Sequence, residues 1–198
     1  MEIEKVFLSN NNESLRRDLV LRLQAGAVMM LPTDTIYGLS CRADQERAIA
    51  KIFAIKRRDY NKPLLVLVSS VSMAKRFCLI NRRQEIILKK IWNQKRPTSV
   101  LLAHRGLLPS NLTAKSDWLA VRLPKSIFLR KIIRSLGAPL VSTSANFSGE
   151  NLLTASAALK CFNQEPRPDL VVVGGRNYKK ASRLIKLEAN GAIEVLRN

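Results

Sequence analysis

Histidine is nearly absent from this chain of 198 residues, in which His104 is the only one. With a single imidazole, neither a Ser-His-Asp triad nor a multi-histidine metal site can be assembled. The GxxxxGK[ST] phosphate loop and the GxGxxG fingerprint are also missing, which excludes two common nucleotide cradles. The three cysteines, Cys41, Cys78 and Cys161, are far apart and odd in number, a pattern typical of reduced thiols. We therefore expect no protein metal ligands and no covalent catalysis.

Long hydrophobic runs are missing as well. No apolar segment approaches the roughly 18 residues that a membrane helix needs, so we expect no membrane partner. The first twelve residues are polar and mixed in charge, and we expect neither a signal peptide nor a transit peptide. Together with the reduced cysteines, these features predict a cytoplasmic location.

Acidic residues are scarce: 15 Asp and Glu stand against 34 Lys and Arg, which gives a net charge of +19. The surplus is concentrated between Arg82 and Leu136, where 13 basic residues accompany only Glu85 and Asp117. Such a field attracts polyanions, and contact with tRNA or double-stranded RNA is one interpretation. A solvated helix face is the other, because no known RNA-recognition motif accompanies the charge.

Apolar segments alternate with turn residues along the chain, and 46% of the residues are hydrophobic. This pattern predicts an α/β fold in which residues 1–198 form a single domain on a twisted mixed sheet. A first helix is expected after Asn12 or Ser14, stopped by Gly26. Further helices are expected at residues 46–55, 72–77, 82–92, 126–136 and 154–162. Strands are expected at residues 27–31, 64–68, 99–103, 119–123, 138–141 and 170–173, followed by an antiparallel hairpin of 184–187 and 192–196.

Small hydrogen-bonding side chains are concentrated in STSANFSG, residues 142–149, directly after the expected strand 138–141. A ligand rich in oxygen atoms needs such donors once water has left the site. The alternative is a Ser/Thr-rich turn that caps a following helix.

Two other segments have a similar position at the end of an apolar element. PTDTIYGL, residues 32–39, follows the strand 27–31 and offers Thr33, Asp34 and Thr35 at its tip, although a capped strand-to-helix turn would look the same. KRRDYNKPL, residues 56–64, places four cations within seven positions. One or two cations are expected at a helix C-terminus, but four resemble a phosphate clamp.

In this order, PTDTIYGL, KRR with KPL after it, AVRLP at Ala120–Pro124, and STSANFSG resemble the motifs of the YrdC/TsaC family, the threonylcarbamoyl-AMP synthases of the tRNA t6A pathway. The resemblance extends from about Leu15 to Arg197, and the length is similar to the short, single-domain form. It implies a YrdC-like fold, a twisted mixed α/β sheet with a concave, basic active face.

The resemblance implies an activity in which L-threonine, bicarbonate and ATP are joined into threonylcarbamoyl-adenylate and pyrophosphate is released. Mg²⁺ is implied as the companion of ATP. A t6A transferase complex is the implied partner, which would move the threonylcarbamoyl group to adenosine 37 of ANN-decoding tRNAs. The substrate supplies the nucleophile, which agrees with a sequence that lacks an activated serine or cysteine.

The family's KxR signature matches Lys56 and Arg58, which are expected to be the catalytic cations, and Lys62 is expected beside them. Arg122 of AVRLP is implied to pair with the amino-acid carboxylate. The full set of expected nucleotide-binding residues is Lys56, Arg58, Lys62, Ser144, Asn146 and Arg197. The full set of expected threonine-binding residues is Thr33, Thr35, Arg122, Ser142 and Ser182.

Two stretches depart from the family's pattern. Trp92–Ser99 keeps the tryptophan and one proline of a WPGPxT-like stretch but loses the glycine, and Arg183 replaces the usual threonine after Ser182. Two alternative functions stay open. One is carbamoyl-adenylate synthesis as in hydrogenase maturation, which normally belongs to a much longer chain, and the other is RNA binding or ribosome maturation.

Overall fold

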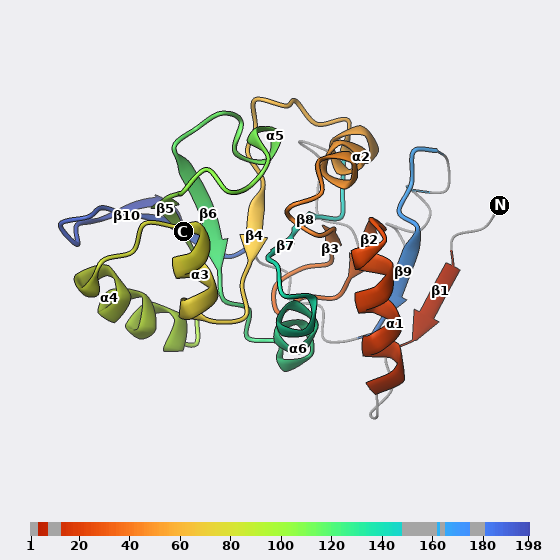
Figure 1. Ribbon diagram of the computed structural model, residues 1–198, viewed down its shortest axis with the longest axis horizontal. Helices are drawn as coiled ribbons and strands as arrows, with labels where there is room; N and C mark the ends of the chain where they lie inside the picture. Colours follow the sequence, from red (N-terminus) through yellow and green to blue (C-terminus); the bar gives the residue numbers. More distant parts are fainter. Residues whose placement is uncertain (1–3, 8–12, 148–161, 163–164, 175–180) are drawn as a thin grey trace.

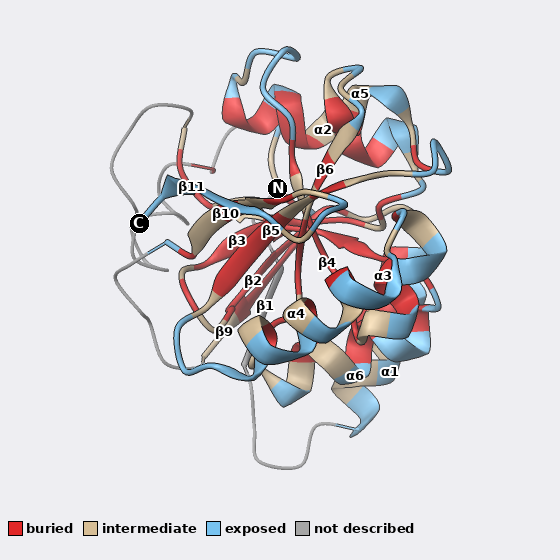
Figure 2. Cartoon of the chain, turned by 90° about the vertical axis from the view of Figure 1, so that its left-hand side faces the viewer, coloured by how far each residue is buried: buried red, intermediate tan, exposed pale blue. Residues whose placement is uncertain are grey.

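The strands of the molecule lie between two groups of helices (Figures 1 and 2). The computed structural model describes residues 4–7, 13–147, 162, 165–174 and 181–198. Helices α2 (Glu46–Lys56) and α5 (Ser110–Thr113) lie on one side of the strands. The other side is covered by α1 (Glu13–Gln24), α3 (Val71–Phe77), α4 (Arg82–Asn93) and α6 (Ile127–Leu136). None of the described helices is both long enough and apolar enough to cross a membrane.

The first sheet has the strand order β1-β9-β2-β3-β8. Its strands are β1 (Glu4–Phe7), β9 (Leu170–Val173), β2 (Met29–Leu31), β3 (Gly38–Ser40) and β8 (Thr143–Ser144). The pairs β1–β9 and β9–β2 are parallel, whereas β2–β3 and β3–β8 are antiparallel. The sheet is therefore mixed, as the sequence predicted.

The second sheet has the order β11-β10-β5-β6-β4-β7. Its strands are β11 (Ile193–Arg197), β10 (Arg183–Leu187), β5 (Thr98–Ala103), β6 (Trp118–Arg122), β4 (Leu65–Leu67) and β7 (Leu140–Val141). The pairs β10–β5 and β4–β6 are parallel, and the other three are antiparallel. The predicted hairpin is confirmed as β10–β11, and Gly191 in its turn has a φ of +87°, which glycine adopts without strain.

One short segment belongs to both sheets. Leu140 and Val141 pair with β4, and after Ser142 the chain continues as β8, which pairs with β3. The amide of Ser142 donates to the carbonyl oxygen of Leu65 at 2.9 Å, so the change of sheet is itself hydrogen-bonded. This crossing brings the ends of three predicted motifs to the same place.

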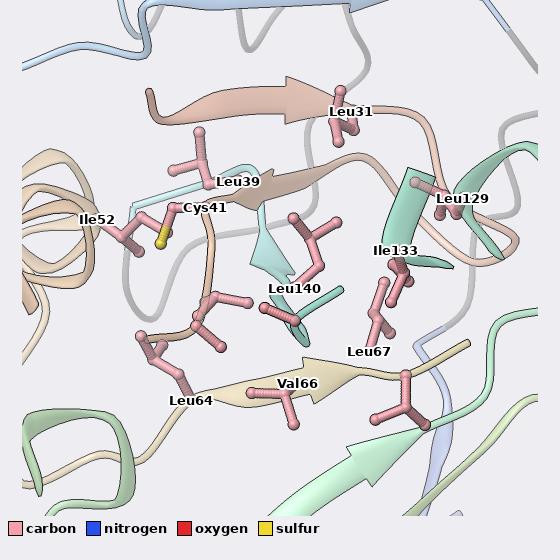
Figure 3. Close-up of a cluster of buried hydrophobic side chains, with 14 of the residues drawn as sticks. Leu31, Leu39, Cys41, Ile52, Leu64, Val66, Leu67, Leu129, Ile133 and Leu140 are labelled. Atoms are coloured by element: carbon pink, nitrogen blue, oxygen red, sulfur yellow. The ribbon is translucent and has the colours of Figure 1, made fainter. Parts of the chain in front are cut away.

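The core fills the space where the two sheets meet, and Leu140 of β7 lies near its centre (Figure 3). Ile52 of α2 approaches it from one side, and Leu129 and Ile133 of α6 approach it from the other. Burying each such side chain contributes about 1.5–3 kcal/mol relative to leaving it exposed. The two helices that close the core were both predicted, at residues 46–55 and 126–136.

Most predicted elements are confirmed to within one or two residues, and the α/β class is correct. The strands form two mixed sheets rather than the one expected. Four short elements were missed: β1, β3, β8 and α5. Each lacks an apolar run of its own, since β1 lies in a polar segment and β3 and β8 lie inside the polar motifs. The helix expected at 154–162 lies almost entirely outside the described residues.

Gly38 offers a test of the close approach between β3 and β8. A Cβ atom at this position would lie 2.8 Å from Oγ of Ser142 and 3.3 Å from the carbonyl oxygen of Thr143. We expect Gly38→Ala to lower the free energy of unfolding by about 1–3 kcal/mol through overpacking, measured by urea denaturation. In a Ser142→Ala background the loss should be clearly smaller, and an equal loss in both backgrounds would contradict this packing.

Candidate functional site

A cleft of about 570 Å³ opens where the two sheets meet. It receives side chains from the β2–β3 turn, the segment after α2, strands β5, β6 and β10, the β7–β8 crossing and β11. Nine of the eleven predicted site residues line it: Thr33, Thr35, Arg58, Lys62, Arg122, Ser142, Ser144, Ser182 and Arg197. The residues that the sequence motifs singled out therefore share one cavity, although they come from distant parts of the chain.

The hydroxyl groups of the cleft are held in fixed positions by one another. Oγ1 of Thr33 lies 2.9 Å from Oγ1 of Thr35 and donates to the carbonyl oxygen of Ile36 at 2.6 Å. On the opposite wall, Oγ of Ser99 lies 2.8 Å from Oγ of Ser182. Ser99 was missed by the sequence analysis. Its place at the end of the altered Trp92–Ser99 stretch was the only signal.

Two of the cleft's arginines are anchored by backbone carbonyl oxygens. Arg58 donates from Nε to the carbonyl of Lys62 at 3.1 Å and from Nη2 to that of Pro63 at 3.0 Å. Arg197 donates from Nη2 to the carbonyl of Ser182 at 2.9 Å. Because a carbonyl oxygen carries no full charge, both guanidinium groups keep their positive charge available to an anion.

Arg122 differs from these arginines because its partner is a carboxylate. Its Nη1 lies 2.9 Å from Oδ1 of Asp34, and the two side chains are only 3% and 7% exposed. Burial lowers the pKa of Arg122, and the neighbouring Asp34 opposes that shift. The pair joins the β2–β3 turn of the first sheet to the end of β6 in the second.

Lys56 and Asn146, the two other predicted site residues, do not line the cleft. Lys56 is 1% exposed, and its Nζ donates to the carbonyl oxygens of Ser144 and Asn146 and to Oδ1 of Asn146, the last two at 2.6 and 3.2 Å. Burial, reinforced by the charge of Arg58, lowers the pKa of Lys56 to about 7. The ammonium group thus holds the STSAN segment from behind, whereas the sequence placed it among the phosphate ligands.

Arg57, one of the four cations of the suggested phosphate clamp, does not line the cleft. It ends α2 in the left-handed conformation, with a φ of +49°. Its guanidinium carbon lies 4.9 Å from the ring centre of Phe147, which packs edge-on against Phe162. This cation–π contact holds the far end of the STSANF segment.

The described lining of the cleft is rich in positive charge. It contains four cations, Arg58, Lys62, Arg122 and Arg197, and no carboxylate, histidine or cysteine among the described residues. Within that part of the chain, no cluster of three metal-ligating side chains occurs. Cys41 and Cys78 are buried free thiols, and burial raises the pKa of Cys78 to about 12. The described lining therefore offers positive charge and hydrogen-bond donors to an anion.

The two departures from the family pattern leave the lining intact. Trp92 donates from Nε1 to the carbonyl oxygen of Thr98 at 3.1 Å, so the end of α4 stays tied to the start of β5 without the glycine. Arg183 is not a lining residue, whereas Ser182 and Leu184 on either side of it are. The side chain of Arg183 therefore alternates away from the cleft.

Comparison with known proteins gives a consistent picture. The family model Sua5_yciO_yrdC, described as "Telomere recombination", matches residues 22–198. A threonylcarbamoyl-AMP synthase of Bos taurus is 33% identical over 160 residues, which cover 80% of this chain and 56% of the relative. One of Yersinia enterocolitica is 30% identical over 172 residues, which cover 84% and 89%. The structure of P. abyssi Sua5 complexed with L-threonine superposes with a TM-score of 0.85 at 25% identity, over 100% of this chain and 57% of that one.

These coverages differ because the relatives differ in length. The chain spans little more than half of the bovine protein and of P. abyssi Sua5, but most of the Yersinia protein. The family model, which matches residues 22–198, covers every described residue that lines the cleft.

The buried side chain of Lys56 affects stability in two measurable ways. Lys56→Met keeps the aliphatic stem but leaves the carbonyls of Ser144 and Asn146 without this donor. We expect the free energy of unfolding at pH 7 to fall by about 1–3 kcal/mol, measured by urea denaturation. The exposed Lys90 of α4 provides the control variant, Lys90→Met, which should change stability by less than about 0.5 kcal/mol.

The pH dependence of stability tests the shifted titration directly. Because the pKa of Lys56 is about 7 in the folded chain and 10.5 without the shift, the unfolded chain binds more protons between these values. The contribution of Lys56 to the free energy of unfolding should therefore rise with pH between 7 and 10, by up to about 1.4 kcal/mol per unit. Lys56→Met should lack that part of the slope. Identical slopes in both proteins would show that the pKa of Lys56 is not lowered.

Proposed function

Because this chain belongs to the Sua5/YciO/YrdC family, we propose that it is a threonylcarbamoyl-AMP synthase. The enzyme joins L-threonine, bicarbonate and ATP into threonylcarbamoyl-adenylate and releases pyrophosphate. The observation that carries the proposal is the cleft itself, whose described lining combines four cations with many hydroxyl groups and no carboxylate. ATP and an amino-acid carboxylate are anions rich in oxygen, and such a lining offers them charge and hydrogen-bond donors together.

The reaction needs no nucleophile from the protein. Threonine's amine and bicarbonate give a carbamate and water, because the new N–C bond forms as a C–O bond of bicarbonate breaks. An oxygen of that carbamate then attacks the α-phosphorus of ATP. The new O–P bond forms as the bond from the α-phosphorus to the pyrophosphate oxygen breaks. The protein contributes by holding the reactants in line and by offsetting negative charge on the phosphorus and the departing pyrophosphate.

Two groups of residues divide the work in this proposal. Arg58, Lys62 and Arg197 face the phosphates, with Ser144 beside them. Arg122 takes the threonine carboxylate, and the hydroxyl groups of Thr33, Thr35, Ser142 and Ser182 surround the rest of the amino acid. Lys56 and Asn146 act from behind the cleft, because they fix the segment that carries Ser144.

Magnesium enters this scheme only with the nucleotide. The described lining contains no carboxylate, so these residues offer no set of oxygen ligands of the kind that Mg²⁺ prefers. The ion would be held by the phosphates of ATP, and no residue is assigned to it.

The wider setting of the reaction is also a proposal. The product is a reactive mixed anhydride, and we assign its use to a t6A transferase complex that modifies adenosine 37 of ANN-decoding tRNAs. A cytoplasmic location fits this setting, and it agrees with the free thiols of Cys41 and Cys78.

Arg58 tests the assignment of the phosphate side. Incubating the protein with ATP, L-threonine and bicarbonate should release pyrophosphate only when all three are present. Arg58→Ala should lower kcat by about 100- to 1000-fold, by analogy with removing one donor to a developing negative charge. Arg47→Ala is the matched control, because Arg47 is an exposed arginine of the preceding helix α2. If Arg58→Ala turns over at the wild-type rate, Arg58 does not act on the phosphates. If the wild-type protein hydrolyses ATP without threonine, the proposed function is wrong.

The basic stretch between Arg82 and Leu136 is expected to contact RNA weakly. Glu85, one of two acids between residues 82 and 136, already pairs with both Lys75 and Lys89, so it neutralises little of the remaining charge. Binding of tRNA and of double-stranded RNA should weaken by about 10-fold or more between 50 and 200 mM salt. Fluorescence anisotropy with labelled RNA measures the binding affinity at each salt concentration. Tight, salt-insensitive binding by a protein without turnover would instead favour a function in RNA binding.

A further inference from the structure

Asp34 lies directly behind the cleft, where it pairs with the lining residue Arg122. Of the four cations that line the cleft, Arg122 is the only one with a carboxylate partner in the part of the chain that the structure describes. Asp34 belongs to the PTDT turn, and Arg122 belongs to the end of β6. The two sequence motifs that approach the cleft from different sheets therefore meet in one ion pair.

We propose that Asp34 is a positioning residue that fixes the guanidinium group of Arg122 for the free α-carboxylate of the amino-acid substrate. This inference rests on the proposed function, and it deepens it by naming the group that selects a free amino acid over a derivative without that carboxylate. Asp34 does not touch the substrate in this scheme.

Hydrogen bonds to both of its oxygens hold the carboxylate of Asp34 in place. Oδ1 of Asp34 accepts from Nη1 of Arg122 at 2.9 Å, and Oδ2 accepts from the backbone amide of Lys125 at 3.0 Å. Lys125 is itself anchored, since its Nζ donates to the carbonyl oxygen of Trp92 at 2.6 Å. With both oxygens occupied, Asp34 cannot turn away without losing a bond, so it holds Arg122 in one orientation.

The guanidinium group of Arg122 keeps hydrogen-bonding capacity beside its ion pair with Asp34. The side chain of Arg122 is 3% exposed, and burial of an unpaired guanidinium would be strongly unfavourable. Asp34 offsets that burial but bonds to only one of the three nitrogens. Nε of Arg122 is buried and has no hydrogen-bond partner among the described residues. The guanidinium is therefore held in place without being saturated, which lowers the entropy that a carboxylate ligand would have to remove on binding.

The test removes the negative charge of Asp34 and keeps the shape of its side chain. In Asp34→Asn, the amide oxygen can still accept from the backbone of Lys125, but Arg122 loses its charged partner. We expect KM for L-threonine to rise about tenfold or more, because Arg122 loses the charge-assisted hydrogen bond that holds it in place. KM for ATP should change by less than about twofold. Calorimetric titration with L-threonine alone should show the same loss of affinity.

A substrate without the carboxylate separates positioning from a general structural effect. L-threoninamide should bind the wild-type protein weakly, and Asp34→Asn should leave that binding unchanged. A double variant with Arg122→Met should be no worse toward threonine than Arg122→Met alone, because Asp34 acts through Arg122. Asp34→Glu, which keeps the charge, should recover part of the affinity, and it serves as the second probe where Asp34→Asn does not fold.

The control is a second ion pair of the same kind outside the cleft. Asp44 pairs with Arg42 at 2.7 Å and is 37% exposed, so Asp44→Asn removes the same charge without touching the site. It should leave KM for threonine unchanged.

If the wild-type protein is active, two results would refute the role of Asp34 while the proposed function stands. In one, Asp34→Asn binds threonine normally, and in the other it loses affinity for threonine and for threoninamide equally. If the wild-type protein neither binds threonine nor releases pyrophosphate, the proposed function fails, and the role of Asp34 fails with it.

Discussion

The buried ammonium group of Lys56 is the contact on which the arrangement of the cleft depends. The segment from Leu140 to Asn146 changes from one sheet to the other within a few residues, and β8 contains only two. Buried backbone carbonyl groups need hydrogen-bond donors, and a strand of two residues supplies few of them through its ladder. Lys56 reaches two of these carbonyls from the end of α2. The position of Ser144 in the cleft follows from that support.

Three consecutive cations at the end of α2 have three different destinations. Lys56 points inward to the backbone of the crossing segment, Arg57 lies over Phe147, and Arg58 turns toward the cleft and the carbonyls of Lys62 and Pro63. The left-handed backbone of Arg57 makes this possible, because it reverses the chain directly after the helix. Two of the three cations therefore shape the STSANF segment, and only the third faces the cavity. A run of positive charge in a sequence does not by itself distinguish these tasks.

The sequence contained enough information to predict which segments form the site, but not how each side chain is used. Helices α2 and α6 were predicted, and six of the nine predicted residues that line the cleft follow the end of an apolar element: Thr33, Thr35, Arg58, Lys62, Ser142 and Ser144. The other three, Arg122, Ser182 and Arg197, were expected only from the resemblance to the family. The burial of Lys56 depends on carbonyl groups 88 and 90 positions away, and no local pattern records such a contact. The pairing of Asp34 with Arg122 spans 88 positions for the same reason. The division into two sheets was hidden because β3 and β8 lie inside polar motifs and have no hydrophobic pattern of their own.

A cleft that is lined by cations and hydroxyl groups places definite limits on how this protein can accelerate a reaction. The described lining supplies cations and hydroxyl groups, and in the proposed reaction the nucleophile comes from the substrates. What remains for the protein is preorganisation: fixed donors and charges aimed at the places where negative charge develops. That form of catalysis depends on rigidity, since a donor that must reorganise loses most of its effect. The hydrogen bonds among Thr33, Thr35, Ser99 and Ser182, the ion pair of Arg122 and the buried ammonium of Lys56 all supply that rigidity. The contacts behind the cleft are therefore as much a part of its chemistry as the side chains that face the substrate.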